Sequence, residues 1–313
     1  MKIISNEELK QVLDFTSLIE NLRQAFREKY TVPLRHHHNY ENPEEGLDST
    51  LLLMPAWQAG SYLGVKIVTV SPNNGKYNLP SIQGFYTLFD ACSGSPIAQM
   101  DAKILTSRRT AAASALASTF LSRKDSKTML MVGTGALAPN LIEAHATARP
   151  IRKVLIWGRD FEKADALARQ LRHLDMEILA AEKIEESIEE ADIISCATLS
   201  DQPLLFGKFL RPGQHLDLVG SFKPDMREAD DACVAKSSVF VDILEGATKE
   251  SGDILLPLQR GVLKKEGIKG ELSDLCRGKH AGRKSEEEIT LFKSVGYATE
   301  DLAAAKLAFE RLA

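Results

Sequence analysis

The sequence predicts an α/β protein in two parts, a doubly wound parallel sheet and a smaller α+β domain. The chain has 313 residues, which is too long for one small core. From Lys127 onward, short apolar runs alternate with helical patterns, as in a parallel sheet covered by helices. Before that point the apolar runs follow one another without helices between them. We therefore expect the α+β domain at 1–124, completed by 290–313, and the parallel sheet at 125–289.

The composition is that of an ordinary globular protein, with 44% apolar and 26% charged residues. The net charge of −4 gives no electrostatic reason to expect nucleic acid or an acidic membrane as a partner. No run approaches the roughly 20 apolar residues that cross a bilayer, and the charged N-terminus lacks a signal-peptide core. The four cysteines are far apart, so neither disulfides nor structural zinc are indicated. We expect a cytoplasmic protein without a metal.

The first domain is predicted to begin with a helix over residues 5–30, whose apolar side chains recur at helical spacing until Pro33. The run His36–His38 lacks the i, i+4 spacing of a helical metal pair, and we interpret it as part of a loop. Residues 71–75 have loop composition, and Leu105–Leu121 is an alanine-rich helix. The predicted strands are Ser49–Met54, Tyr62–Val70, Gly84–Asp90 and Pro96–Asp101.

In the second domain, strands and helices alternate regularly, which indicates a parallel sheet. The end of the chain, Glu286–Leu312, is predicted to be helix-rich and to pack on the first domain. The predicted strands are Met129–Val132, Val154–Trp157, Glu177–Leu179, Ile193–Cys196, His215–Val219 and Val239–Val241. The predicted helices are Pro139–Arg149, Lys163–Leu174, Ile184–Glu190 and Met226–Ala235.

A glycine-rich turn, Gly133-Thr134-Gly135-Ala136-Leu137-Ala138, follows the first of these strands and opens a helix. This context is that of the Rossmann-type dinucleotide-binding fingerprint, whereas glycines alone also mark ordinary turns. Gly133 permits the tight turn, Gly135 lets the backbone approach a pyrophosphate, and Ala138 is small enough for close packing of helix on strand. The free N–H groups and the helix dipole then stabilise the diphosphate charge.

The end of the second strand bears on which nicotinamide cofactor is used. Proteins that bind NAD usually place Asp or Glu there to accept hydrogen bonds from the ribose. This chain has Gly158 at that position, and Arg159 next to it can pair with a 2′-phosphate. NADP(H) is therefore favoured. NAD(H) is the alternative, with Asp160 as the ribose acceptor.

Several stretches resemble the ornithine cyclodeaminase/mu-crystallin family and run in the family's order along nearly the whole chain. The resemblance implies a homodimer whose N-terminal domain and last helix form the substrate site and the dimer interface. It also implies a nicotinamide cofactor and activity on amino acids or their imines. The matching stretches are Leu105–Ala112, Val132–Ala136, Trp157–Arg159, Gly220–Glu228 and Thr290–Gly296.

By this resemblance, Arg109 corresponds to the arginine that binds the substrate carboxylate, although it could instead belong to a local ion pair. Lys66 corresponds to a lysine near the reacting centre, although alternation along its strand could point it to solvent. Arg35 and Ser81 are further substrate-binding candidates. The candidate cofactor contacts are Gly133, Thr134, Gly135, Ala136, Leu137, Gly158, Arg159, the strand-end residues Ala197, Thr198, Gly220 and Ser221, and the segment Ser294, Val295 and Gly296.

Two departures from the family pattern affect the expected chemistry. Cyclodeaminases carry acidic residues where this chain has Leu52 and Phe222, and a deaminating cyclisation needs such groups to move protons. We therefore expect a reductase of small cyclic imino acids, Δ1-pyrroline-2-carboxylate or its six-membered homologue. The alternatives are an ornithine cyclodeaminase, an alanine-type amino-acid dehydrogenase and a non-catalytic binding protein like mu-crystallin.

Overall fold

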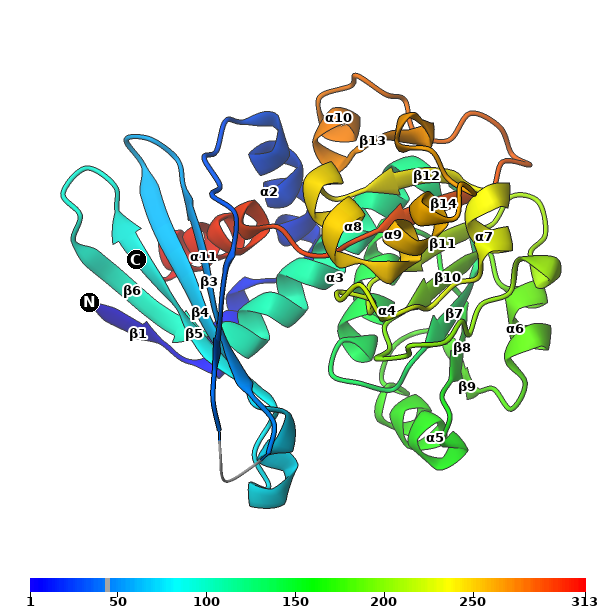
Figure 1. The fold of residues 1–313 in the computed structure, drawn as a ribbon, viewed down its shortest axis with the longest axis horizontal. Helices are drawn as coiled ribbons and strands as arrows, with labels where there is room; N and C mark the ends of the chain where they lie inside the picture. The colour runs from blue at the N-terminus through cyan, green and yellow to red at the C-terminus, as the bar shows by residue number, and fades with distance from the viewer. Residues whose placement is uncertain (43–45) are drawn as a thin grey trace. The chain divides into compact units, whose positions relative to one another are not determined.

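The computed structural model describes residues 1–42 and 46–313. The chain divides into two compact units, Met1–Thr110 with Tyr297–Ala313, and Ala111–Gly296 (Figure 1). These boundaries differ from the expected ones at 124/125 and 289/290. The first boundary falls inside the continuous helix α3 (Ala102–Leu121), and the second follows strand β14 (Thr290–Lys293), which pairs with strands of the second unit.

The first unit contains a six-stranded sheet in the order β1-β6-β5-β4-β3-β2. Its neighbours are antiparallel, except for β1 and β6. The four predicted strands are present, and β3 continues beyond its predicted end. The sequence pattern does not predict the short strand β1 or the edge strand β2. The bounds are β1 Lys2–Ile4, β2 His36–Tyr40, β3 Ser49–Trp57, β4 Tyr62–Val70, β5 Ile82–Asp90 and β6 Pro96–Asp101.

The interpretation of His36–His38 as loop residues is wrong, because they lie in β2. They pair with Leu51–Leu53 of β3, and all five side chains of β2 are exposed. An edge strand is held by backbone hydrogen bonds on one side only. Since neither face of this strand is buried, its sequence does not alternate between apolar and polar residues.

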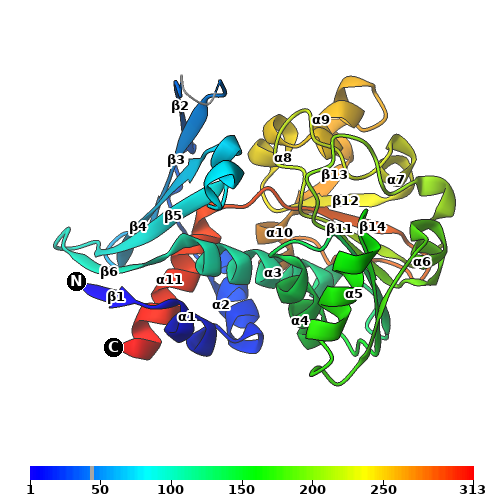
Figure 2. The same ribbon diagram turned by 90° about the horizontal axis from the view of Figure 1, so that it is seen from below.

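The helix predicted over residues 5–30 is divided into α1 and α2. Asp14 starts the second helix, since its carboxylate accepts the N–H of Ser17 at 2.9 Å. Helix α11 packs against β3, β4 and β5, and α1 and α2 pack against α11 on the same side of the sheet (Figure 2). The predicted loop at 71–75 is largely a 3₁₀ helix. The bounds are α1 Asn6–Val12, α2 Phe15–Arg27, η1 Pro72–Tyr77 and α11 Ala298–Leu312.

The second unit contains an eight-stranded sheet in the order β13-β12-β14-β11-β10-β7-β8-β9, in which all strands are parallel. The strand order reverses at β7, which lies between β8 and β10. An open α/β sheet binds its ligands beyond the carboxyl ends of the strands at such a reversal. The bounds are β7 Thr128–Val132, β8 Lys153–Trp157, β9 Glu177–Ala180, β10 Ile193–Cys196, β11 His215–Leu218, β12 Ser238–Val241 and β13 Ile268–Glu271.

The predicted helix-rich tail, Glu286–Leu312, is wrong in its first half. β14 inserts between β11 and β12, and its four residues are buried on both faces of the sheet. A four-residue run that is buried on both faces has no periodicity to distinguish it from a helix. Only the part from Ala298 onward is the predicted helix, and it belongs to the first unit.

Two other helices start at capping residues that shift their predicted bounds. Asp160 caps α5, which begins before Lys163, and Asp230 caps α7, which begins well after Met226.

In the described part of the chain, no helix is long and apolar enough to span a membrane. The bounds are α4 Ala138–Ala148, α5 Phe161–Gln170, α6 Ile184–Glu190, η2 Gly207–Phe209, α7 Asp231–Lys236, α8 Leu244–Glu250, α9 Gly252–Gln259, η3 Lys265–Gly267 and α10 Leu272–Cys276.

Candidate functional site

The turn between β7 and α4 requires a glycine at its first position. Gly133 has a φ of +114°, and its N–H donates to the carbonyl oxygen of Trp157 at 2.8 Å. A Cβ atom on Gly133 would lie 2.6 Å from the carbonyl oxygen of Ala197. Both the backbone angle and the neighbouring strand therefore exclude any other residue.

Gly135 is different, because the surrounding protein does not require a glycine there. A Cβ on Gly135 would meet no atom within 4 Å. The N–H groups of Thr134–Leu137 donate to no other described residue, and no side chain caps the start of α4. Unobstructed backbone and unpaired N–H groups at a helix start are what a pyrophosphate needs. The residues of this turn therefore fit a dinucleotide.

At the end of β8, Arg159 and Asp160 are in different situations. Asp160 acts as the helix cap of α5, since its carboxylate accepts the N–H of Lys163 at 3.3 Å and lies 3.5 Å from the Lys163 ammonium. Arg159 is exposed and forms no ion pair with another described residue. Gly158 packs closely on the turn, where a Cβ would lie 2.9 Å from the Thr134 methyl group. An unpaired guanidinium thus stands beside the position of the expected ribose.

The strand-end candidates Ala197, Thr198, Gly220 and Ser221 follow the adjacent strands β10 and β11, and the carboxylate of Glu228 joins the two groups. Its Oε1 accepts the N–H of Thr198 at 2.7 Å and the Thr198 hydroxyl at 2.9 Å. Its Oε2 accepts the N–H of Gly220 at 2.7 Å and that of Ser221 at 3.3 Å. Burial raises the pKa of Glu228 above its usual value.

A second buried carboxylate, that of Asp242, holds the segment Ser294–Gly296. Its Oδ2 accepts the N–H groups of Val295 and Gly296, both at 2.7 Å, and the Ser294 hydroxyl at 3.3 Å. Burial raises the pKa of Asp242, against the effect of these backbone N–H groups. The three residues that follow β14 are therefore fixed as one rigid turn, which ends at Gly296 with a φ of +85°.

In the first unit, Lys66 and Arg109 meet two carboxylates inside the protein. Lys66 Nζ lies 2.9 and 2.8 Å from the two carboxylate oxygens of Asp301, and 3.4 Å from the Thr106 hydroxyl. Arg109 donates from Nε to Asp301 at 2.8 Å and from Nη1 to Glu300 at 2.6 Å. All four charged side chains are almost fully buried. Two cations and two anions in one apolar setting compensate each other's desolvation.

The charges of this cluster shift the pKa values in opposite directions. Burial, assisted by the charge of Arg109, lowers the pKa of Lys66 to about 8 although Asp301 opposes the change. Burial opposes the ionisation of Asp301, but Arg109 and Lys66 outweigh it and lower the pKa of that carboxyl. Burial thus brings the pKa of Lys66 closer to neutral pH than that of an ordinary lysine.

The alternative that Lys66 points to solvent is wrong, since alternation along β4 buries Gly64, Lys66 and Val68 together. Arg109 does form the local ion pair that was the alternative to a substrate contact. Its third nitrogen, Nη2, makes no hydrogen bond to a described residue. Arg35 is half-buried, and its charge contributes to lowering the pKa of Lys66.

Ser81 does not join this cluster through any hydrogen bond of the described residues. It is exposed, and its carbonyl oxygen accepts the N–H of Ser71 at 2.8 Å. Leu52 is half-buried beside Val68 in the register of β3 and β4, and Phe222 is exposed. Neither side chain is a carboxylate, so neither position can move protons as the acidic residues of cyclodeaminases do.

Sequence reasoning does not identify the four carboxylates that hold these candidates in place. Glu300 and Asp301 form an acidic pair in the first turn of an otherwise alanine-rich helix. Two buried cations need counter-ions, and this acidic pair in an apolar helix indicates which residues supply them. Glu228 ends the matching stretch Gly220–Glu228, but nothing in that stretch indicates what its carboxylate binds, and Asp242 has no such signal.

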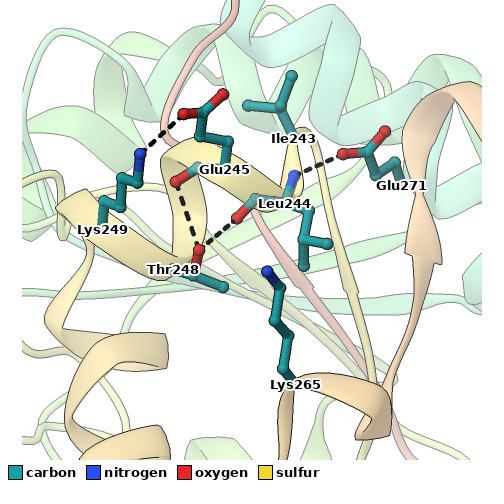
Figure 3. A pocket seen from close by; sticks show the side chains of 7 residues that line it. All are labelled: Ile243, Leu244, Glu245, Thr248, Lys249, Lys265 and Glu271. Atoms are coloured by element: carbon teal, nitrogen blue, oxygen red, sulfur yellow. Dashed lines mark hydrogen bonds and ion pairs between the residues drawn. The ribbon is translucent and has the colours of Figure 1, made fainter.

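A cavity of about 400 Å³ lies at the carboxyl ends of β12 and β13, separated from β7 by β14, β11 and β10 (Figure 3). Three of its charged residues bind other residues of the lining. Lys249 pairs with Glu245 at 2.7 Å, and Glu271 accepts the N–H of Leu244 at 2.7 Å (Figure 3). In residues 1–42 and 46–313, no group of three or more His, Cys, Asp or Glu side chains could hold a metal ion.

The model of the ornithine cyclodeaminase/mu-crystallin family matches residues 2–313. A Δ1-pyrroline-2-carboxylate reductase of Colwellia psychrerythraea is 38% identical over 316 residues, the whole of both chains. The structure of the Thermococcus litoralis Δ1-pyrroline-2-carboxylate reductase with NADH and L-proline has a TM-score of 0.92 and 36% identity, covering 99% of this chain and 97% of that one. An archaeal alanine dehydrogenase dimer with bound NAD has a TM-score of 0.90 and 28% identity, with coverages of 99% and 95%. The chain belongs to the ornithine cyclodeaminase/mu-crystallin family.

Proposed function

We propose that this protein reduces the C=N bond of a small cyclic imino acid, Δ1-pyrroline-2-carboxylate or its six-membered homologue, to L-proline or L-pipecolate. The observation that carries the proposal is the buried group of Lys66, Arg109 and Asp301 in a chain with Leu52 and Phe222 at the positions of the cyclodeaminase carboxylates. Two relatives with 38% and 36% identity are named Δ1-pyrroline-2-carboxylate reductase, and both align with nearly the whole chain.

In this proposal the substrate carboxylate binds to the first unit through cationic side chains. Arg109 has two of its nitrogens committed to Asp301 and Glu300, so the free Nη2 is the group that contacts the substrate. Arg35 adds a second positive charge. A guanidinium held rigidly by two carboxylates loses little entropy on binding a planar carboxylate.

Lys66 is the proposed proton donor to the imine nitrogen. Its ammonium is oriented by Asp301 and Thr106, and a pKa of about 8 suits an acid that gives up its proton near neutral pH. Nicotinamide, when bound, supplies the hydride. The turn Gly133–Ala138, the strand-end residues after β10 and β11 and the segment Ser294–Gly296 would hold that cofactor.

NADP(H) is the proposed preferred cofactor, because Arg159 is exposed without an ion-pair partner among the described residues whereas Asp160 caps α5. Replacing Arg159 by Ala should raise the Kd for NADPH about tenfold or more and leave the Kd for NADH nearly unchanged. Fluorescence titration of both cofactors measures this. Equal losses for the two cofactors would assign the 2′-phosphate contact to another residue.

A substrate panel tests the reaction itself. Purified protein should oxidise NADPH or NADH with Δ1-pyrroline-2-carboxylate or Δ1-piperideine-2-carboxylate, and more slowly with pyruvate and ammonia. Ammonia release from L-ornithine without any reductase activity would overturn the proposal in favour of a cyclodeaminase. Faster turnover of pyruvate with ammonia would favour an alanine-type dehydrogenase.

The proposal includes a homodimer in the cytoplasm that binds neither nucleic acid nor a membrane. Support for the dimer comes from the related alanine dehydrogenase, which is a dimer. Further support comes from the incompletely buried row Leu53, Ile67 and Phe85 on one face of the sheet in the first unit. The four cysteines are all free thiols, three of them buried, which is usual in a reducing compartment.

A further inference from the structure

We propose that Glu228 is a positioning residue that sets the separation of the two cofactor-contacting segments Ala197–Thr198 and Gly220–Ser221. This inference rests on the proposed function, because it takes these segments as contacts of the nicotinamide cofactor. Glu228 itself would not touch the cofactor. It would act by holding the carboxyl ends of β10 and β11 at one fixed spacing.

The division of the hydrogen bonds between the two carboxylate oxygens supports this role. Oε1 accepts two hydrogen bonds from Thr198, from its N–H at 2.7 Å and from its hydroxyl at 2.9 Å. Oε2 accepts the N–H groups of Gly220 and Ser221, at 2.7 and 3.3 Å. One planar group therefore accepts four donors from the two segments, besides a contact with the Cys196 thiol at the end of β10. A change at either oxygen is expected to release one segment and leave the other bound.

The backbones of the two segments also lie close together at Gly220 and Thr198. A Cβ on Gly220 would collide with backbone atoms of Thr198 and with Oε1 of Glu228. Glycine at this position is thus required by the closeness of the two loops. The loops are held in contact, with the carboxylate of Glu228 as the bridge between them.

The backbone of Glu228 is held by its own hydrogen bonds, so its side chain can act as a fixed bridge. Its N–H donates to Asp253 Oδ1 at 2.8 Å, and its carbonyl oxygen accepts the N–H groups of Leu204 and Leu205, both at 2.9 Å. Asp253 is in turn paired with the buried Lys293 of β14 at 3.4 Å. The backbone of Glu228 is therefore fixed by residues other than Thr198, Gly220 and Ser221, which its side chain joins.

The sharpest test is Glu228→Gln, which keeps the shape but replaces one oxygen with an NH₂ group. That NH₂ would face N–H donors of one loop, so this loop loses its acceptor and is pushed away. We expect the Kd for NADPH to rise about tenfold or more, measured by the change in nicotinamide fluorescence on binding. The KM for the imine at saturating cofactor should change less than about threefold, because the first unit is intact.

Thr198→Val is the second variant, chosen because it removes only the hydroxyl and leaves the N–H bond to Oε1. Its Kd for NADPH should rise a few-fold, and it keeps the test open if Glu228→Gln does not fold. In the double variant the Thr198→Val effect should shrink, since both changes act through one carboxylate. Glu245→Gln, at an exposed carboxylate of α8, is the matched control and should leave the Kd unchanged.

The outcomes separate this inference from the proposed function. If the wild type binds no nicotinamide cofactor, the proposed function fails and the inference falls with it. If the wild type binds NADPH and folded Glu228→Gln binds it with the same Kd, the inference is overturned and the proposed function stands. A rise in imine KM equal to the rise in cofactor Kd would also overturn it, because that pattern indicates general loosening of the fold.

Discussion

Asp301 is the residue on which the charged cluster of the first unit depends, since it contacts both Lys66 and Arg109. Replacing it by Asn removes the negative charge but keeps the volume. Two buried cations would then face each other with only Glu300 to compensate them. We expect kcat/KM for the imine to fall about 10²-fold, in steady-state assays with saturating cofactor. Glu310→Gln, at an exposed carboxylate near the end of the same helix, should have no effect.

The pH dependence follows from Lys66, which must carry a proton in order to donate it. Its pKa is about 8 in the folded protein, so kcat/KM should be constant below that value and fall as pH rises through it. Asp301 raises the pKa of Lys66 against the effect of burial. In Asp301→Asn the fall should therefore begin at a lower pH than in the wild type. A pH profile with the same alkaline limb in both proteins would remove Lys66 from the role of proton donor.

At the scale of elements, Arg149 binds several residues at the C-terminal end of α3. Arg149 donates from Nη2 to the carbonyl oxygens of Ser118 and Thr119 at 2.7 and 2.8 Å, and from Nε to the hydroxyl of Ser122 at 2.8 Å. It thereby donates to carbonyl oxygens in the last turn of the helix, where the backbone supplies fewer partners. Arg149→Ala should lower the free energy of unfolding by about 3 kcal/mol, measured by urea denaturation.

Arg169→Ala is the control for this prediction, because Arg169 forms an exposed pair with Asp165 on α5. It should change the free energy of unfolding by less than about 0.5 kcal/mol. Equal effects of the two substitutions would show that the helix end is satisfied by water as well as by Arg149.

Elements with a clear period could be predicted from the sequence, and those without one could not. The strands Tyr62–Val70 and Ile193–Cys196 and the helix Ile184–Glu190 have the predicted bounds. β2 is exposed on both faces and β14 is buried on both faces, so neither strand alternates between apolar and polar residues. At the site, the turn at Gly133 is local and was predictable. The contact of Asp301 with Lys66 joins positions 235 residues apart, which no local pattern specifies.

At the scale of the whole molecule, one face of the sheet in the first unit is not covered by α1, α2 or α11, the helices packed on its other side. Helix α11 covers the other face, where Lys66 and Tyr86 are buried. The open face carries the row Leu53, Ile67 and Phe85, which are register partners on three adjacent strands. All three side chains are half-buried or exposed. Contiguous apolar surface of this kind is costly in water and is typical of a protein interface.

A second copy of the chain is the proposed cover for this face, since a two-fold axis can pair a surface with itself. Ile67→Glu places a charge in the middle of the row and should convert the dimer to a monomer, as measured by light scattering after size exclusion. Leu179→Glu, at an exposed leucine on the edge strand β9 of the second unit, should leave the mass unchanged. Because Ile67 and Lys66 point to opposite faces of β4, the monomer should still bind NADPH. A wild-type monomer, or a dimer that survives Ile67→Glu, would assign the open face to some other partner.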